Sequence, residues 1–302
     1  MTSIPTAVLG RTGLKVTRLG YGAAHRKLIE NPQRGTILNA VLDVGINYID
    51  TAGCYGNSEE LIGRYLSKRR SEFHIATKSG CVPTEDLWIR VGRKVDHYYD
   101  SKNVFDGLHR SLKRLKTDHI DVMQPHNPNV EQVVDEELVN TLIKMKEQGK
   151  IRWIGISTSL PHLSTYLQWD VFDVFQLPYS AFQRDLEGWI AKAANAGVGI
   201  VINGGVAMGE PGLGKGEMTN RWGKYDEAKL DDLRNHKESK TSFILRYTLT
   251  HPNSNTNIVG TSNINHLLEN IESVQRGPIP MNIYAEVRRR LTNVGMLPVK
   301  VT

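Results

Sequence analysis

The chain has 302 residues, of which 39% are hydrophobic and 23% are charged, and its formal net charge is +6. A chain of this length can bury a large core, and it contains no run of 18 or more apolar residues, so we expect no membrane span. Two basic runs, Lys68–Arg70 and Arg288–Arg290, lack interleaved aromatic residues, which favours solvated surfaces over a nucleic-acid site.

The amino-terminal segment and the cysteines indicate in which cellular compartment we expect the protein. The first twenty residues lack the uninterrupted apolar region and cleavage site of a secretory signal. Cys54 and Cys81 are too few for a disulfide framework, and the sequence has no CxxC pair and no cysteine–histidine cluster with zinc-site spacing. We therefore expect a cytoplasmic protein with reduced thiols and no metal site.

The chain opens with a hairpin pattern from Ala7 to Val16, in which Gly10–Gly13 reads as the turn. Eight short runs follow, and each is apolar at successive positions, which is typical of strands covered on both faces. These predicted strands are Arg18–Gly22, Tyr48–Asp50, His74–Lys78, Ile120–Gln124, Trp153–Ser157, Val174–Leu177, Gly199–Asn203 and Asn257–Gly260.

Helical periodicity separates these strands. One apolar stripe ends at Gly45, another begins after a predicted cap at Ser101 and runs to Leu115, and two more end at Gly149 and Gly197. Eight strands alternating with helices predict a (β/α)8 TIM barrel. We expect one domain over residues 1–302, with the hairpin at the N-terminal mouth of the barrel. Long loops over residues 79–101 and 204–228 are expected at the C-terminal face.

Polar side chains stand at or just past three successive strand ends, namely Asp50, Tyr55, Lys78 and His126. Taken singly, each has an ordinary structural interpretation as a cap, a solvent-facing cation or a packing residue. Taken together, they suit proton transfer to a developing alkoxide. A phenol has a pKa of about 10, and we expect the Lys78 ammonium to lower the pKa of Tyr55. Asp50 would orient Lys78, and His126 would donate to a substrate oxygen or share the proton.

The segment Asn47–Gly63, which reads NYIDTAGCYGNSEELIG, resembles the signature of the aldo-keto reductase superfamily. The likeness continues through Leu9–Val16, Ala76–Lys78, Ile120–His126, Gly149–Ser157, Ile258–Ser262 and Glu269–Asn270. The resemblance implies a TIM barrel, reduction of an aldehyde or ketone, and an extended NADPH bound without a Rossmann domain. It also implies Tyr55 as the proton donor, with Asp50, Lys78 and His126 completing a tetrad.

The resemblance further implies where the cofactor binds. Ser157, Thr158 and Gln176 would hold the carboxamide, and Asn203 stands where an aromatic ring usually stacks on the nicotinamide, unless Tyr179 or a loop aromatic replaces that ring. The loop of Gly204, Gly205, Val206, Ala207 and Gly209 would wrap the pyrophosphate, or else is a plain flexible loop. The adenosine end would contact Thr261, His266, Glu269 and Asn270.

Three departures from the family pattern leave the cofactor choice open. Thr158 replaces the usual asparagine, Asn203 replaces the aromatic, and only Thr261 and His266, with Lys215 from the loop as a further candidate, could read a 2′-phosphate. NADPH is favoured, and NADH is possible. The candidate walls of a substrate pocket are His25, Trp88, Tyr98, Tyr99, Asn127 and Trp222.

The main hypothesis is therefore an NAD(P)H-dependent reductase of a small-molecule carbonyl compound. The alternative is a catalytically slow, NADP(H)-binding regulatory subunit, because potassium-channel β subunits resemble the same superfamily. The replaced cofactor contacts support the alternative, and the complete tetrad supports the enzyme.

Overall fold

The computed structural model describes residues 3–24, 34–81, 97–212 and 220–301. Eight parallel strands close into a barrel in the order β10-β3-β4-β5-β6-β7-β8-β9, which confirms the predicted TIM barrel. Each strand overlaps a predicted run. The strands are β3 (Leu19–Gly22), β4 (Tyr48–Asp50), β5 (His74–Ser79), β6 (Ile120–Pro125), β7 (Ile151–Ser157), β8 (Val174–Pro178), β9 (Gly199–Asn203) and β10 (Thr256–Val259).

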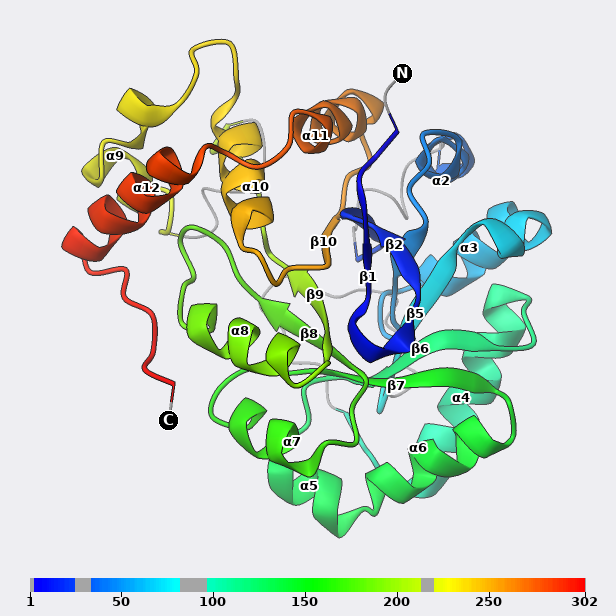
Figure 1. The fold of residues 1–302 in the computed structure, drawn as a ribbon. Helices are drawn as coiled ribbons and strands as arrows, with labels where there is room; N and C mark the ends of the chain where they lie inside the picture. Colours follow the sequence, from blue (N-terminus) through cyan, green and yellow to red (C-terminus); the bar gives the residue numbers. More distant parts are fainter. Residues whose placement is uncertain (1–2, 25–33, 82–96, 213–219, 302) are drawn as a thin grey trace.

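Helices surround the barrel, as Figure 1 shows. The longer ones are α2 (Arg34–Asp43), α3 (Ser58–Leu66), α4 (Ser101–Leu115), α6 (Leu138–Glu147), α8 (Glu187–Asn195), α10 (Lys240–Thr250), α11 (Ile264–Gln275) and α12 (Met281–Asn293). Shorter pieces are α5 (Val130–Asp135), α7 (Leu163–Trp169), α9 (Gly223–Glu227), η2 (Ser67–Glu72) and η4 (Leu230–Leu233). No helix within the described ranges has the length and apolar character that crossing a bilayer requires.

The start of α4 corrects one prediction. Ser101 is the first helical residue, and the cap is Asp100, whose carboxylate accepts from the backbone N–H of Asn103 at 2.9 Å. Asp100 has a non-helical backbone, which turns its side chain back toward that N–H group. The predicted stripe is otherwise present, because Val104 and Leu115 are buried against the barrel.

The amino-terminal hairpin consists of β1 (Thr6–Val8) and β2 (Lys15–Thr17), joined through the 3-10 turn η1 (Gly10–Thr12). Leu9 and Val16 are fully buried in one cluster with side chains from barrel strands β4, β5, β6, β8 and β9. The Arg11 N–H donates to the Gly197 carbonyl at 2.7 Å, just before β9 begins. The hairpin therefore plugs the N-terminal mouth, as predicted, and in Figure 1 it crosses that end in dark blue.

Both predicted basic runs are engaged in ion pairs. Arg70 pairs with the buried Asp121 at 2.6 Å, and Arg288 pairs with the buried Glu187 at 2.6 Å. Their neighbours pair with exposed or half-buried carboxylates, namely Arg69 with Asp43 and Glu72, and Arg289 and Arg290 with Glu286. The arginines of both runs therefore form ion pairs within the fold.

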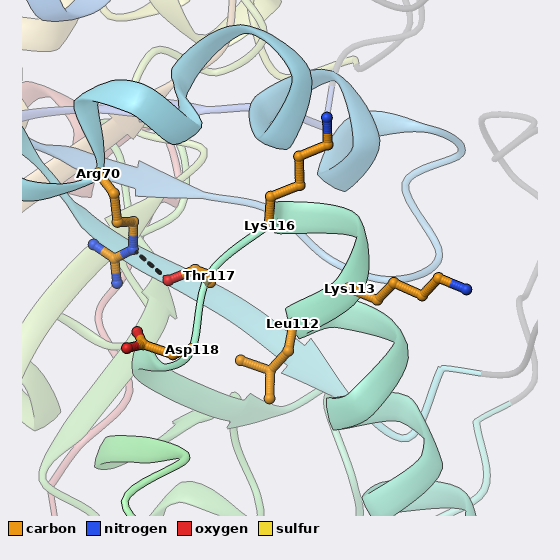
Figure 2. Close-up of a pocket in the computed structure, with 6 residues that line it drawn as sticks. All are labelled: Arg70, Leu112, Lys113, Lys116, Thr117 and Asp118. Atoms are coloured by element: carbon orange, nitrogen blue, oxygen red, sulfur yellow. Dashed lines mark hydrogen bonds between the residues drawn. The ribbon is translucent and has the colours of Figure 1, made fainter.

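A hollow of about 560 Å³ lies on the outside of the barrel, between the last turn of α4 and η2. Figure 2 shows its lining residues, which are Arg70, Leu112, Lys113, Lys116, Thr117 and Asp118. Arg70 precedes β5, and Thr117 and Asp118 precede β6, so the hollow is at the N-terminal ends of the strands. Barrel enzymes build their sites at the opposite end, where the predicted tetrad lies.

Candidate active site

The centre of the site is a buried ion pair between β4 and β5. Asp50 ends β4, and Lys78 lies near the end of the neighbouring β5. The Lys78 ammonium donates to both Asp50 carboxylate oxygens, at 2.9 and 2.7 Å, and to the Thr51 carbonyl at 2.9 Å. The two side chains are only 1% and 3% exposed. Asp50 therefore orients Lys78 as predicted, and the pair is held away from water.

Two glutamines complete the hydrogen bonding of Asp50. The Gln176 amide nitrogen donates to Asp50 Oδ1 at 2.7 Å, and the Gln124 amide nitrogen donates to the same oxygen at 3.3 Å. The predicted role of Gln176 was a carboxamide contact, but the structure directs its amide nitrogen to Asp50. Gln124 was not singled out, although a glutamine within an otherwise apolar strand was the available signal.

Tyr55 lies in the loop between β4 and α3, against this pair. The Lys78 ammonium is 4.8 Å from the centre of the Tyr55 ring. Burial raises the pKa of Tyr55 to about 12, Lys78 acts in the opposite direction, and Asp50 adds to the rise. The predicted lowering by Lys78 is therefore present, but burial and the Asp50 charge outweigh it, so the pKa of Tyr55 lies above its ordinary value. Tyr55 holds its proton at neutral pH, as a proton donor requires.

His126 follows β6 and lies edge-on to Tyr55, with ring centroids 5.8 Å apart. The Tyr99 hydroxyl donates to the His126 carbonyl at 2.7 Å and fixes this part of the backbone. Burial, with the charges of Lys78 and His97, lowers the pKa of His126 well below its ordinary value. The imidazole is therefore neutral. The structure thus brings together all four residues of the predicted tetrad.

Of the other predicted nicotinamide contacts, Ser157 and Thr158 lie at the end of β7, and Asn203, the residue at the stacking position, lies at the end of β9. The Ser157 hydroxyl donates to the Asn127 side-chain oxygen at 2.9 Å, and Thr158 is buried beside it. Asn203 is half-buried at the end of β9. Tyr179, the possible replacement for the missing aromatic, is 1% exposed and packs on Tyr247 and His251 in the core. Its ring therefore offers no face to a nicotinamide.

The predicted pyrophosphate loop forms a tight turn whose backbone is held by hydrogen bonds. The backbone has positive φ at Gly204, Ala207 and Gly209. The N–H groups of Ala207 and Gly209 donate to the carbonyls of Gly204 and Val206 within the turn, so these two do not point to an anion. Outside groups hold its backbone: the Thr248 hydroxyl donates to the Gly205 carbonyl, and the Trp222 indole donates to the Ala207 carbonyl.

The predicted adenosine contacts lie after β10 and on the first turns of α11. Thr261 is buried, and its hydroxyl accepts from the Asn263 N–H at 3.1 Å. His266 is exposed, Glu269 is half-buried and Asn270 is buried. Positions 266, 269 and 270 share one helix face, and their contact with adenosine stays a prediction.

The candidate pocket walls divide into three groups. Tyr99 and Trp222 are 3% and 5% exposed, and Trp222 packs on Phe182 and Tyr225, so both support the loops from within. Tyr98 and Asn127 are exposed near the site. His25 and Trp88, together with the loop cation Lys215, lie outside the described residues.

The profile of the Aldo/keto reductase family matches residues 18–290. The chain belongs to this family. It is therefore an aldo-keto reductase, a TIM-barrel oxidoreductase of the class that reduces carbonyl compounds with a pyridine nucleotide.

Individual relatives match this aldo-keto reductase over most of their own length. The holo form of the aldo-keto reductase AKR11C1 from Bacillus halodurans superimposes with a TM-score of 0.82 at 27% identity, covering 98% of each chain. The uncharacterized oxidoreductase YqkF of Bacillus subtilis is 29% identical over 88% of this chain and 89% of its own. A probable voltage-gated potassium channel subunit beta from Oryza sativa subsp. japonica is 24% identical over 90% of this chain and 91% of its own.

This aldo-keto reductase also has a feature beside its tetrad that corrects a prediction. Spacing along the chain indicated no cysteine–histidine cluster, yet Cys54, Cys81, His97 and His126 present ligand atoms that all lie within 4.8 Å of one another. Local spacing missed the cluster because its members come from the connections after β4, β5 and β6, which only the barrel brings together.

Proposed function

We propose that this aldo-keto reductase uses NADPH to reduce an aldehyde or ketone, with Tyr55 giving the proton to the carbonyl oxygen. The nicotinamide supplies the hydride from C4. The observation that carries the proposal is the buried Lys78–Asp50 pair, with its ammonium 4.8 Å from the Tyr55 ring. A protonated phenol beside a buried cation is suited to protonating a developing alkoxide.

Each tetrad residue has a distinct task in this proposal. Asp50, held by Gln124 and Gln176, keeps Lys78 charged and oriented. As Tyr55 releases its proton, the Lys78 ammonium stabilises the phenolate that remains. His126 is neutral, so it donates a hydrogen bond to the carbonyl oxygen without adding a charge to the site.

Substitution of the phenol tests the assignment. Tyr55→Phe should lower turnover by roughly 10²–10⁴-fold, the usual contribution of a general acid, while NADPH affinity measured by fluorescence titration stays within about twofold. Tyr65→Phe in α3, remote from the tetrad strand ends, is the matched control. Unchanged turnover in Tyr55→Phe would refute the role of Tyr55.

We also propose that NADPH is preferred to NADH, and that Thr261 and His266 contact the 2′-phosphate. Thr261 lies two residues before Asn263, the cap of α11, and His266 lies in the first turn of that helix, where backbone N–H groups favour an anion. His266→Gln should weaken NADPH binding and leave NADH binding unchanged. Equal affinity of the unaltered protein for the two nucleotides would contradict this preference.

The second candidate is a regulatory subunit with slow turnover, which the likeness to the rice channel subunit and the replacements Thr158 and Asn203 support. Negligible turnover on a panel of aldehydes and ketones, with NADP(H) still bound, would favour this role. Brisk turnover that Tyr55→Phe removes would exclude it. We propose the same single domain, residues 1–302, for either function.

A further inference from the structure

Four sulfur and nitrogen ligand atoms converge next to Tyr55, in a group that we call the Cys2His2 cluster: Cys54, Cys81, His97 and His126. Cys54 comes from the loop after β4, Cys81 from the end of β5, and His126 from the end of β6. His97 reaches the cluster because it pairs with Cys81 in an isolated antiparallel bridge. Cys81 is buried and the other three are half-buried.

The cluster is compact in all directions. The two sulfur atoms are 3.1 Å apart, and the two facing ring nitrogens, His97 Nε2 and His126 Nδ1, are 3.0 Å apart. Sulfur–nitrogen separations are 3.4 Å from Cys54 to His126, 3.6 Å from Cys81 to His126 and 3.8 Å from Cys54 to His97. The remaining pair, Cys81 and His97, lies within 4.8 Å.

These separations are close to the edges of a zinc tetrahedron. With Zn–S bonds of about 2.3 Å and Zn–N bonds of about 2.05 Å, the edges are about 3.8 Å for S–S, about 3.5 Å for S–N and about 3.3 Å for N–N. The largest difference among the measured pairs is the shorter S–S edge, which modest rotation of the two cysteine side chains about χ1 would lengthen. The S–S separation of 3.1 Å also exceeds the bond length of a disulfide.

We propose that Cys54, Cys81, His97 and His126 bind one tetrahedral metal ion of the zinc class. Two sulfurs and two imidazole nitrogens are the donor set of structural zinc sites, and their softness disfavours Mg²⁺ and Ca²⁺. As Zn²⁺ binds, four bonds form to the metal, and the two thiol protons leave to solvent, so no oxidant is needed. All four positions are filled by protein, so the metal does not itself coordinate substrate.

The surrounding backbone holds these ligands in place. The Tyr98 N–H donates to the Gly80 carbonyl at 2.9 Å, which fixes the segment that carries His97 against the end of β5. The Tyr99 hydroxyl donates to the His126 carbonyl at 2.7 Å. Such supporting contacts orient metal ligands before the ion arrives.

Metal binding at His126 has a consequence that rests on the proposed function. The cluster uses His126 Nδ1, so a metal there fixes the tautomer that carries its proton on Nε2. This is the tautomer that donates a hydrogen bond to a carbonyl oxygen. The metal would thus act through His126, as a positioning element one ligand away from the reacting atoms.

The test measures metal binding directly, on the full-length protein with both thiols reduced. After chelator treatment and desalting, the protein should take up one Zn²⁺ per chain by mass spectrometric metal analysis. Co²⁺ should give the visible absorption bands of a tetrahedral site, with thiolate-to-cobalt charge transfer. Cys54→Ser and His97→Asn should each weaken Zn²⁺ binding by about a hundredfold or more, since each removes one of four ligands.

His109→Asn is the matched control, because His109 is an exposed histidine on α4, and it should bind Zn²⁺ as the unaltered protein does. Substoichiometric Zn²⁺ in the reduced, folded protein, or equal affinity in Cys54→Ser and the control, would overturn the proposal. Tyr55→Phe should retain the metal. Loss of the proposed proton donor and loss of the proposed metal site are therefore distinguishable.

Discussion

Lys78→Met removes the ammonium from the centre of the site while preserving most of the side-chain volume. The side chain is 1% exposed, and its nitrogen donates to both oxygens of Asp50, at 2.9 and 2.7 Å. The substitution leaves the Asp50 carboxylate buried without its counter-charge. We therefore expect a large loss of stability in addition to a loss of activity.

The expected loss of stability in Lys78→Met depends on the groups that remain around Asp50. Breaking a buried ion pair by removing one partner typically costs about 3–5 kcal/mol, because an uncompensated charge stays buried. Two amide donors, Gln176 at 2.7 Å and Gln124 at 3.3 Å, still solvate one carboxylate oxygen. We expect a value near the lower end of that range, about 3 kcal/mol.

The assay is equilibrium unfolding in urea for Lys78→Met, Asp50→Asn and the double variant. If the cost arises from the unpaired carboxylate, Asp50→Asn introduced into Lys78→Met should recover about 1–2 kcal/mol, because the amide carries no charge. A double variant less stable than Lys78→Met, or a single variant as stable as the unaltered protein, would refute this reasoning.

Three further predictions concern the scaffold. Burial acts to raise the pKa of Asp121, but the hydrogen bond with His74 and the charge of Arg70 hold that pKa well below its ordinary value. Ionised Asp121 therefore stabilises the fold at pH values above the pKa of an aspartate in the unfolded chain, which is about 3.9. This contribution is lost as the pH falls through the lower pKa that Asp121 has in the folded protein. In Asp121→Asn, the urea concentration at the midpoint of unfolding should therefore decrease less as the pH is lowered. A methyl group on Gly63 would collide with the backbone of α4, so Gly63→Ala should lower the unfolding free energy by about 1–3 kcal/mol, and unchanged thermal melting would contradict this close packing. Asp100→Ala should cost about 1 kcal/mol in urea unfolding through loss of the α4 cap, whereas Ser101→Ala should cost less.

The barrel was predictable because its signal is repeated and local. Each strand is buried on both faces, so its residues are apolar at successive positions, and the intervening helices end at glycines such as Gly45 and Gly149. The cap of α4 was misplaced by one residue because Asp100 and Ser101 are both good capping residues. Only the backbone conformation of Asp100 distinguishes them.

The positions of the tetrad were also predictable, but its electrostatics were not. Strands that run parallel in a closed barrel bring their C-terminal ends to one face, so Asp50, Lys78 and His126 had to lie near one another. The sign of the Tyr55 shift depends on how much water burial removes and on the distances to two opposite charges. Neither quantity can be read from sequence motifs, and in the structure the effect of burial on the pKa of Tyr55 outweighs that of the ammonium.

The Cys2His2 cluster arises from the same convergence that brings the tetrad together. Cys54 precedes Tyr55, Cys81 follows the strand of Lys78, and His126 is itself a tetrad residue, so three of the four ligands lie at neighbouring strand ends. Cys54 and Cys81 are 27 residues apart in sequence, and His97 and His126 are 29 residues apart. Zinc-site spacing rules describe short local motifs, whereas here the closed barrel brings the ends of β4, β5 and β6 together without a regular spacing in sequence. His97 is added by its bridge to Cys81.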